Sequence, residues 1–175
     1  TTASFKTELA LYARPPQWLF TPILDNYTRV LNNIPFLQYL KNSLVIAIGT
    51  TLGSLVLGTL VGYGFARFHF RGSEAVRFLV LVTRMAPRMV LVVPYYLMMQ
   101  RLGLLDTYTD LLVAYVSFAL PFSIWLLIGF FVEVPLDVEE AAMIDGCSRL
   151  GVLIRIVIPI AAPGLVVAAI FAFLV

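Results

Sequence analysis

The 175-residue chain is 61% hydrophobic and only 13% charged, with a mean hydropathy of +0.94. A soluble domain of this length does not need so much apolar material for its core, so the composition indicates a membrane protein. A net charge of +2 without a basic block does not favour a nucleic-acid partner, and the lone Cys147 excludes an internal disulfide framework.

The first 41 residues precede the first long apolar run and do not have the pattern of a secretory signal peptide. They contain four prolines, and we expect them to form an ordered external loop or short helices: Pro15, Pro16, Pro22 and Pro35. The chain starts without Met and ends within a hydrophobic run. We therefore expect a fragment of a longer protein that lacks at least one span at one end or both.

Residues 42–175 are predicted to form an all-α, polytopic membrane bundle. Uncharged runs favour spans at about 42–66 and 111–132, and a truncated span at about 164–175. The apolar stretch 78–100 is a further span, although two arginines interrupt it. Because the runs are continuous and do not alternate in polarity, they indicate helices and not barrel strands.

Basic residues near the ends of the spans suggest the orientation. The loops 67–77 and 133–155 lie on one side of the predicted bundle and together carry five arginines: Arg67, Arg71, Arg77, Arg149 and Arg155. The opposite side carries Arg29, Lys41 and Arg101. This excess favours a cytoplasmic location for the loop 133–163.

Small residues recur at every fourth position of the first span, where they form one helix face. Ser54, Gly58 and Gly62 belong to this stripe, which allows another helix to approach closely. We interpret it as a helix-packing surface, with a permeation surface as the alternative.

Arg84 and Arg88 are four residues apart and share a helix face inside the second apolar stretch. An arginine inside the bilayer costs at least about 2.5 kcal/mol unless it meets water or a partner. Two interpretations are open: the pair faces a solute pathway, or both side chains reach the cytoplasmic interface. The prolines at 87 and 94 predict a bend or break near residues 85–87.

Polar and aromatic residues near the middle of the third span are candidates for the substrate pathway. Trp125 is unusual at this depth, because tryptophan prefers the membrane interface. It can stack on a sugar ring, and core packing is the alternative. Further candidates of the same kind are Ser117, Ser123, Tyr63, Tyr95, Tyr96 and Gln100.

The loop 133–163 contains the stretch EEAAMIDG, which is too polar for a span and too short for a core. Pro135 can occupy the first turn of a helix, and Gly146 after Asp145 can end one. The sequence thus predicts a helix of about ten residues outside the bilayer, with Ala141 and Ala142 at its centre. Such a helix serves either as a docking element or as a solvated connector.

The segment 140–159 resembles the EAA loop of inner-membrane permease subunits in binding-protein-dependent ABC importers. That family's pattern is E-A-A, three residues, G, nine residues, I-x-L-P. Here Glu140, Ala141 and Ala142 are followed at the same gaps by Gly146 and by Ile156 to Pro159, with Ile158 in place of Leu. The stretches LGLLDTYTDLL and ALPFSIWLLIGFF are similar to the carbohydrate branch, the maltose-type second subunit.

The resemblance implies a type I ABC importer permease of the cell inner membrane that transports a sugar by alternating access. Compared with that family, this chain is expected to be a fragment that lacks the first span and the C-terminal part. It implies a cytoplasmic ABC ATPase dimer, a second permease subunit and an extracytoplasmic solute-binding protein as partners, within membrane lipid. It implies ATPase coupling through Glu140, Ala141, Ala142, Asp145, Gly146 and Pro159. ATP and magnesium belong to the ATPase, and this chain has no phosphate-binding loop and no metal constellation, so we expect no cofactor and no enzymatic activity in it.

Two alternatives to a sugar importer are open. Within the same importer class the solute can be glycerol phosphate or another small polar solute. Arg84 and Arg88, if they face the pathway, would favour an anionic solute. In a different class, an ion-coupled secondary transporter would be expected to place carboxylates inside its spans. The predicted spans 42–66, 78–100 and 111–132 contain none.

Overall fold

The computed structural model describes residues 2–15, 18–68, 70–85 and 87–175. The chain divides into two compact units, residues 1–44 and 45–175. The first unit contains the short helices η1 (Thr2–Phe5), α1 (Glu8–Leu11) and α2 (Asp25–Asn33). The Asn26 side-chain amide holds it together by donating hydrogen bonds of 2.9 Å to the carbonyls of Ser4 and Lys6.

Two helices are long and apolar enough to cross a membrane: α3 (Phe36–Arg67) and α6 (Tyr108–Glu133). Both extend beyond the predicted spans. α3 begins six residues before residue 42, directly after Pro35, because a helix can continue past the apolar part of its sequence into polar surroundings. α6 begins after Thr107, whose hydroxyl accepts a hydrogen bond from the Asp110 backbone N–H and so caps the helix.

The stretch expected as one span at 78–100 consists of two helices. α4 (Ser73–Met85) ends and α5 (Arg88–Leu102) begins on either side of the predicted break. Pro87 has extended backbone angles, φ −60° and ψ 123°, and lacks the N–H that would continue the helix. Neither α4 nor α5 alone has the length of a crossing helix.

The C-terminal third of the second unit bends sharply. α7 (Leu136–Ile144) and α8 (Arg149–Val152) lead into a π-helical turn, η2 (Leu153–Val157), and then into α9 (Ile158–Ile160) and α10 (Ala162–Phe173). The helical segment 149–160 and α10 meet at an angle of 82°. α10 thus begins two residues before the predicted start at 164, and together with residues 149–160 it would make a third crossing segment.

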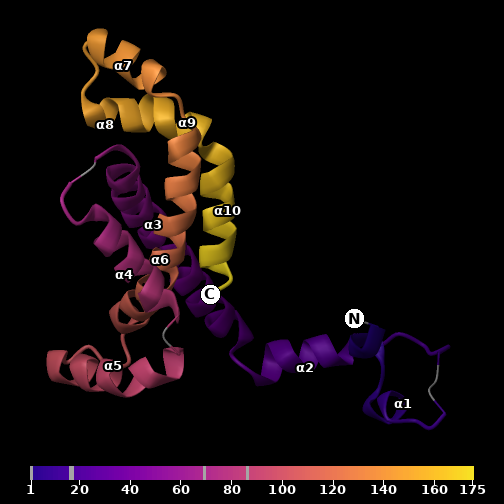
Figure 1. Ribbon diagram of the computed structural model, residues 1–175. Helices are drawn as coiled ribbons and strands as arrows, with labels where there is room; N and C mark the ends of the chain where they lie inside the picture. Colours follow the sequence, from indigo (N-terminus) through magenta and orange to yellow (C-terminus); the bar gives the residue numbers. More distant parts are fainter. Residues whose placement is uncertain (1, 16–17, 69, 86) are drawn as a thin grey trace. The chain divides into compact units, whose positions relative to one another are not determined.

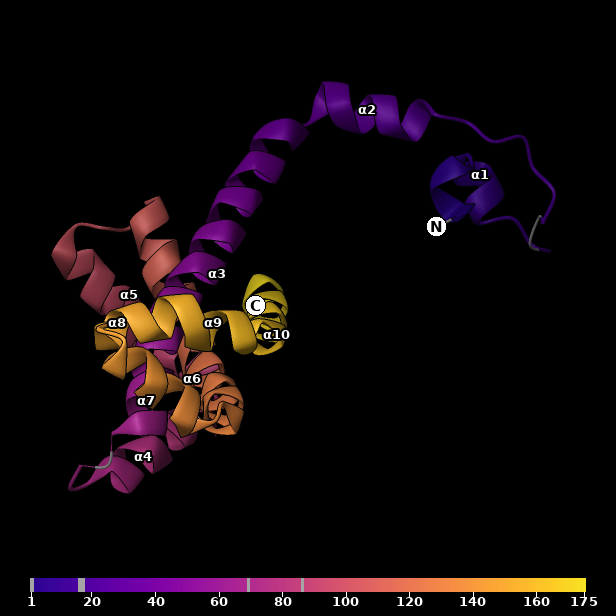
Figure 2. The same ribbon diagram turned by 90° about the horizontal axis from the view of Figure 1, so that it is seen from above.

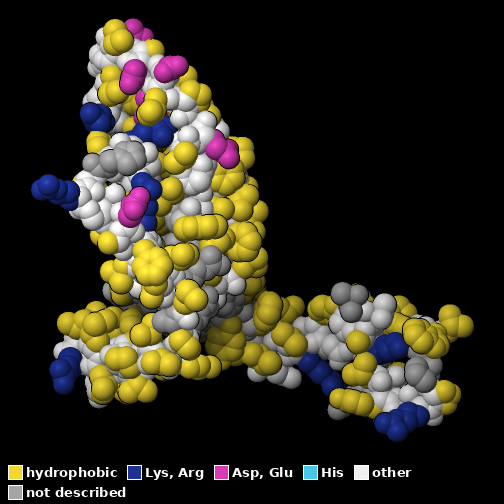
Figure 3. All heavy atoms as spheres, viewed as in Figure 1, with side chains coloured by type: hydrophobic (Ala, Val, Ile, Leu, Met, Phe, Trp, Pro, Cys, Tyr) yellow, Lys and Arg dark blue, Asp and Glu magenta, His cyan; other side chains and the backbone are white. Residues whose placement is uncertain are grey.

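Within the second unit, α10 packs along α6, and α4 packs on another side of α6. Figure 1 shows α7, α8 and α9 gathered at one end of these helices and α5 at the opposite end, and Figure 2 shows α7 to α9 from above, over the end of the bundle. In Figure 3 most charged side chains of this unit lie toward the α7–α9 end, whereas the visible face of α10 is largely hydrophobic.

Small residues bring the helices together. Ser54, Gly58 and Gly62 are buried in α3, and a Cβ on Gly58 would stand 3.1 Å from the Cβ of Ser123 in α6. In α10, a Cβ on Gly164 would stand 2.3 Å from the ring of Phe130 in α6. Glycine at these positions lets the backbone approach its neighbour as closely as the packing requires.

Candidate functional site

α7 carries the EAA residues and is bounded by clear start and stop signals. Pro135 precedes the first helical residue with extended angles, φ −62° and ψ 133°, one position earlier than the first turn to which the sequence assigned it. At the other end, Gly146 has φ +88°. Its N–H donates to the Met143 carbonyl and the N–H of Cys147 donates to the Ala142 carbonyl, at 3.1 and 3.0 Å. These bonds form a Schellman motif, which needs a residue such as glycine in the left-handed conformation.

One face of α7 points away from the rest of the unit. Its exposed residues follow the spacing of a single helix face: Asp137, Glu140, Ala141 and Ile144. Ile144, the last residue of α7, is 86% exposed. This outer face therefore combines carboxylates, a small residue and an exposed apolar residue, a combination suited to contact with another protein.

The opposite face of α7 is buried through Glu139 and Ala142, which are 3% and 7% exposed. The Tyr63 hydroxyl donates a 2.7 Å hydrogen bond to Oε2 of Glu139, and Nε of Arg67 donates a 2.7 Å bond to Oε1. Nη2 of Arg67 lies 2.5 Å from Oε1 and also donates a 2.8 Å bond to the Val134 carbonyl. We call these side chains the Tyr63–Arg67–Glu139 cluster.

An apolar core surrounds this cluster. Ala142 packs in it with side chains of α6 and η2, among them Leu127, Phe131 and Val157. The Tyr63 ring meets the Phe131 ring edge to face, with centroids 6.1 Å apart. The small side chain of Ala142 therefore packs in the core of this unit. Ala141 is the small residue on the exposed face of α7.

The chain after α7 is shaped by its own local interactions. The Ser148 hydroxyl accepts a 3.2 Å hydrogen bond from the Gly151 N–H and caps α8. The π-helical turn η2 directly precedes α9, in which Pro159 is exposed and lacks the N–H of a regular helical residue. Asp145 and Gly146 are exposed at the turn between α7 and α8.

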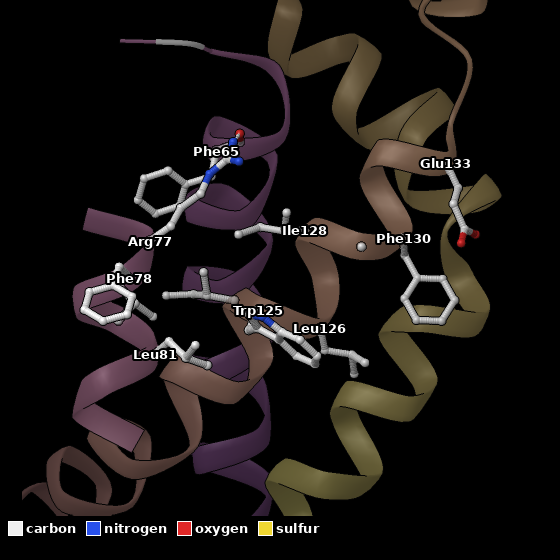
Figure 4. Close-up of a pocket in the computed structure, with 12 residues that line it drawn as sticks. Phe65, Arg77, Phe78, Leu81, Trp125, Leu126, Ile128, Phe130 and Glu133 are labelled. Atoms are coloured by element: carbon white, nitrogen blue, oxygen red, sulfur yellow. Dashed lines mark hydrogen bonds between the residues drawn. The ribbon is translucent and has the colours of Figure 1, made fainter. Parts of the chain in front are cut away.

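A separate open cavity of about 530 Å³ lies between α4 and α6. Figure 4 shows the Trp125 indole between Leu81 of α4 and Leu126 of its own helix, with Phe65, Arg77 and Phe78 further along the wall. Trp125 is 55% exposed, so its ring is accessible. Arg77 donates a hydrogen bond to the Phe65 carbonyl.

The other predicted pathway residues are not gathered around this cavity. Ser123 is fully buried against Gly58, and its hydroxyl donates to the Ala119 carbonyl at 3.2 Å. Ser117 lines a second cavity of about 270 Å³ between α4, α5, α6 and α10. The Tyr95 hydroxyl donates to the Asp110 carbonyl at 2.6 Å, and Tyr96 is half exposed. The side chains of Arg84 and Arg88 lie outside the part that the structure describes.

The part of the chain that the structure describes holds no group of three His, Cys, Asp or Glu side chains placed to bind a metal ion. The Tyr63–Arg67–Glu139 cluster is the feature that sequence reasoning missed. The spacing of Tyr63 and Arg67, four residues apart at the end of an apolar run, was an available signal. The partner carboxylate is 72 residues away in sequence, and nothing local distinguishes Glu139 from Glu140.

Comparison with known proteins places these features in a family. Residues 54–175 match the family model "Binding-protein-dependent transport system inner membrane component". The chain is 35% identical over 171 residues to the sulfoquinovosyl glycerol transport system permease protein SmoH of Agrobacterium fabrum, covering 97% of this chain and 60% of that protein. It is 37% identical over 171 residues to the trehalose/maltose transport system permease protein MalG of Thermococcus litoralis, covering 93% and 62%.

The trehalose transport system permease protein SugB of Mycobacterium tuberculosis is 38% identical over 154 residues, covering 88% of this chain and 56% of that protein. The fold also matches a solved bacterial ABC transporter involved in the import of the acidic polysaccharide alginate, with a TM-score of 0.82 at 23% identity over 99% of this chain and 61% of that one. The chain spans about three fifths of the length of its relatives. It belongs to the family of inner-membrane components of binding-protein-dependent transport systems.

Proposed function

We propose that the protein to which this chain belongs is the permease subunit of an ATP-driven importer for a sugar. In this proposal two cytoplasmic ATPase subunits, a second permease subunit and an extracytoplasmic solute-binding protein complete the importer. The permease forms half of the translocation pathway and changes access from one side of the membrane to the other. The chemistry of ATP belongs to the ATPase subunits.

The geometry of α7 is the observation that carries the proposal. α7 lies at the end of the helical bundle, outside the two long apolar helices, and exposes a face with Asp137, Glu140, Ala141 and Ile144 (Figure 1). A surface that combines carboxylates, a small residue and an apolar side chain suits contact with another protein, because interfaces bury apolar side chains within a polar rim. We infer that this face docks on the ATPase, with Glu140 in a polar contact there.

The proposed mechanism is mechanical. Closure of the ATPase dimer would move the α7 helices of the two permease subunits toward each other. Because helices and packed cores are stiff, a displacement of α7 passes into the bundle and does not dissipate locally. Gly146 and Pro159 would shape the chain that links α7 to α10. Access to the solute pathway would then alternate between the two sides of the membrane.

A sugar is the proposed solute because several relatives are named for trehalose, maltose or sulfoquinovosyl glycerol transport. Within this chain, Trp125 is our candidate for contact with the solute. Its half-exposed indole forms part of the wall of the 530 Å³ cavity, and aromatic rings suit the apolar faces of sugar rings. Ser123, which is buried against α3, does not line this cavity.

An affinity purification of the full-length protein from its native membranes tests the proposal. Wild type and Glu140→Ala are compared for the ATPase that co-purifies and for ATP-dependent uptake of a radiolabelled sugar. We expect the substitution to weaken both. Glu74→Ala, an exposed carboxylate in the first turn of α4, is the matched control and should behave like wild type. Absence of an ATPase from both samples would contradict the proposal.

A further inference from the structure

We propose that the Tyr63–Arg67–Glu139 cluster is a clamp that fixes α7 to the end of α3, so that displacement of α7 moves α3 with it. The three side chains are positioning residues for coupling, and the proposal rests on the coupling function proposed above. It assigns different roles to the two adjacent glutamates. Glu139 faces the permease bundle, and Glu140 faces the partner.

The bonding of the carboxylate supports this assignment. Both oxygens of Glu139 are occupied, Oε2 by the Tyr63 hydroxyl and Oε1 by the Arg67 guanidinium. Glu139 and Arg67 side chains are only 4% and 8% exposed, so water does not compete strongly for these bonds. Charge-assisted hydrogen bonds in such surroundings are stronger and more directional than exposed ones.

Arg67 links three elements at once. It is the last residue of α3, it binds Glu139 in the first turn of α7, and it donates a hydrogen bond to the carbonyl of Val134, the residue that directly follows α6. The guanidinium can make these bonds together because its donors form a rigid planar fork. The first turn of α7 thus cannot move away from α3 without leaving a buried charge unpaired.

The position of the cluster on α3 gives it a mechanical consequence. Tyr63 and Arg67 lie one turn apart on α3. The small residues Ser54, Gly58 and Gly62 lie on the same helix and are buried, and Gly58 and Gly62 face α6. Clamping α7 at the end of α3 therefore joins it to a helix of 32 residues. A displacement at the clamp would act over the length of that helix.

The first test measures coupling in full-length importer complexes reconstituted in vesicles, as sugar molecules transported per ATP hydrolysed. Tyr63→Phe removes a single hydroxyl hydrogen bond, and we expect this ratio to fall about fivefold, the factor that corresponds to about 1 kcal/mol. Glu139→Gln removes the charge that Arg67 pairs with and should lower the ratio of sugar transported to ATP hydrolysed further. Glu74→Gln is the matched control, since its carboxylate is exposed. A merely structural role would lower the amount of assembled complex but not the ratio.

The second test needs no variant of the clamp. Spin labels on cysteines replacing the exposed Leu60 of α3 and Val138 of α7, which lies off the docking face, report the distance between the two helices in a Cys147→Ser background. We expect the same distance distribution in the resting and the ATP-trapped complex. A shift between the two states would overturn the clamp, even if the Glu139 and Tyr63 variants fail to assemble.

The two proposals fail in different ways. If Glu140→Ala releases the ATPase while Tyr63→Phe and Glu139→Gln transport at the wild-type ratio, α7 is the docking helix and the clamp is wrong. If no ATPase binds the wild-type protein, the coupling function itself is wrong. If Glu140→Ala and Glu139→Gln both lower the ratio, but only Glu140→Ala releases the ATPase, both proposals are supported.

Discussion

Gly146 shows how one residue fixes the boundary of α7, the proposed docking helix. Its φ of +88° closes the Schellman motif at the end of α7, and an added Cβ would meet no atom within 4 Å. The cost of a side chain there is thus conformational and not steric. We expect Gly146→Ala to lower the free energy of unfolding of the full-length protein by about 1–2 kcal/mol.

Thermal unfolding in detergent measures this change. Gly146→Asn should be less harmful, because asparagine enters the left-handed region more readily than alanine. Equal losses for the two variants would contradict a conformational origin.

Trp125 is the residue whose proposed role is most easily separated from packing. We expect Trp125→Ala to lower sugar uptake or change its selectivity while the assembled complex is recovered in wild-type amount, because the indole is 55% exposed at an open cavity. Trp125→Phe keeps an aromatic ring and should retain more uptake. Uptake kinetics that are unchanged in Trp125→Ala would assign the residue to packing.

Glu139 and Glu140 show which site residues a sequence pattern can predict and which it cannot. Glu140 is identified by its place in the EAA pattern, which fixes its gaps to Gly146 and Pro159. Glu139 has the same chemistry and the same local surroundings. Its burial depends on Arg67 and Tyr63, which only the packing of α3 against α7 brings to it. Local pattern therefore predicted the exposed member of the pair and not the buried one.

At the scale of helices, close contact between α6 and α10 depends on Gly164. A Cβ at this position would stand 2.3 Å from the Phe130 ring, so Gly164→Ala forces the ring or the helix to shift. Overpacking of this kind costs about 1–3 kcal/mol, and we expect that loss in thermal unfolding of the full-length protein.

Gly129→Ala is the matched control for Gly164→Ala, because Gly129 adjoins Phe130 in α6 and a Cβ on it would meet no atom within 4 Å. Alanine is favoured over glycine in helices by about 1 kcal/mol, so this variant should be neutral or more stable. A second substitution, Phe130→Leu, should restore part of the stability of Gly164→Ala. Destabilisation by both glycine variants alike would show that the contact does not decide the effect.

The elements that the sequence predicted well are those whose signal is contained in the element itself. The uncharged runs located α3 and α6, and Pro135, Asp145 and Gly146 located α7. The single span predicted at 78–100 is two helices, α4 and α5. The apolar composition of a stretch does not show whether one helix continues through a proline such as Pro87. The bend of 82° before α10 depends in the same way on backbone geometry that hydropathy does not contain.

At the scale of the second unit, charge and apolar surface are separated along the helices. The α7–α9 end carries most of the charged side chains in Figure 3, while α3 and α6 are long apolar helices. This distribution fits a unit whose middle faces lipid and whose α7 end is in water. The excess of arginines in the loops at that end predicts that it is cytoplasmic.

Labelling of Cys147 can test that orientation. It is the only cysteine of the chain and is partly accessible, and it directly follows Gly146 at the end of α7. We expect a membrane-impermeant maleimide to label it in inside-out vesicles and not in intact cells, and bound ATPase to slow the labelling. Asp106→Cys in a Cys147→Ser background, between α5 and α6 at the opposite end, should show the reverse pattern. Labelling of Cys147 from the outside alone would place α7 on the wrong side of the membrane for any contact with a cytoplasmic ATPase, and would reject the coupling function together with the predicted orientation.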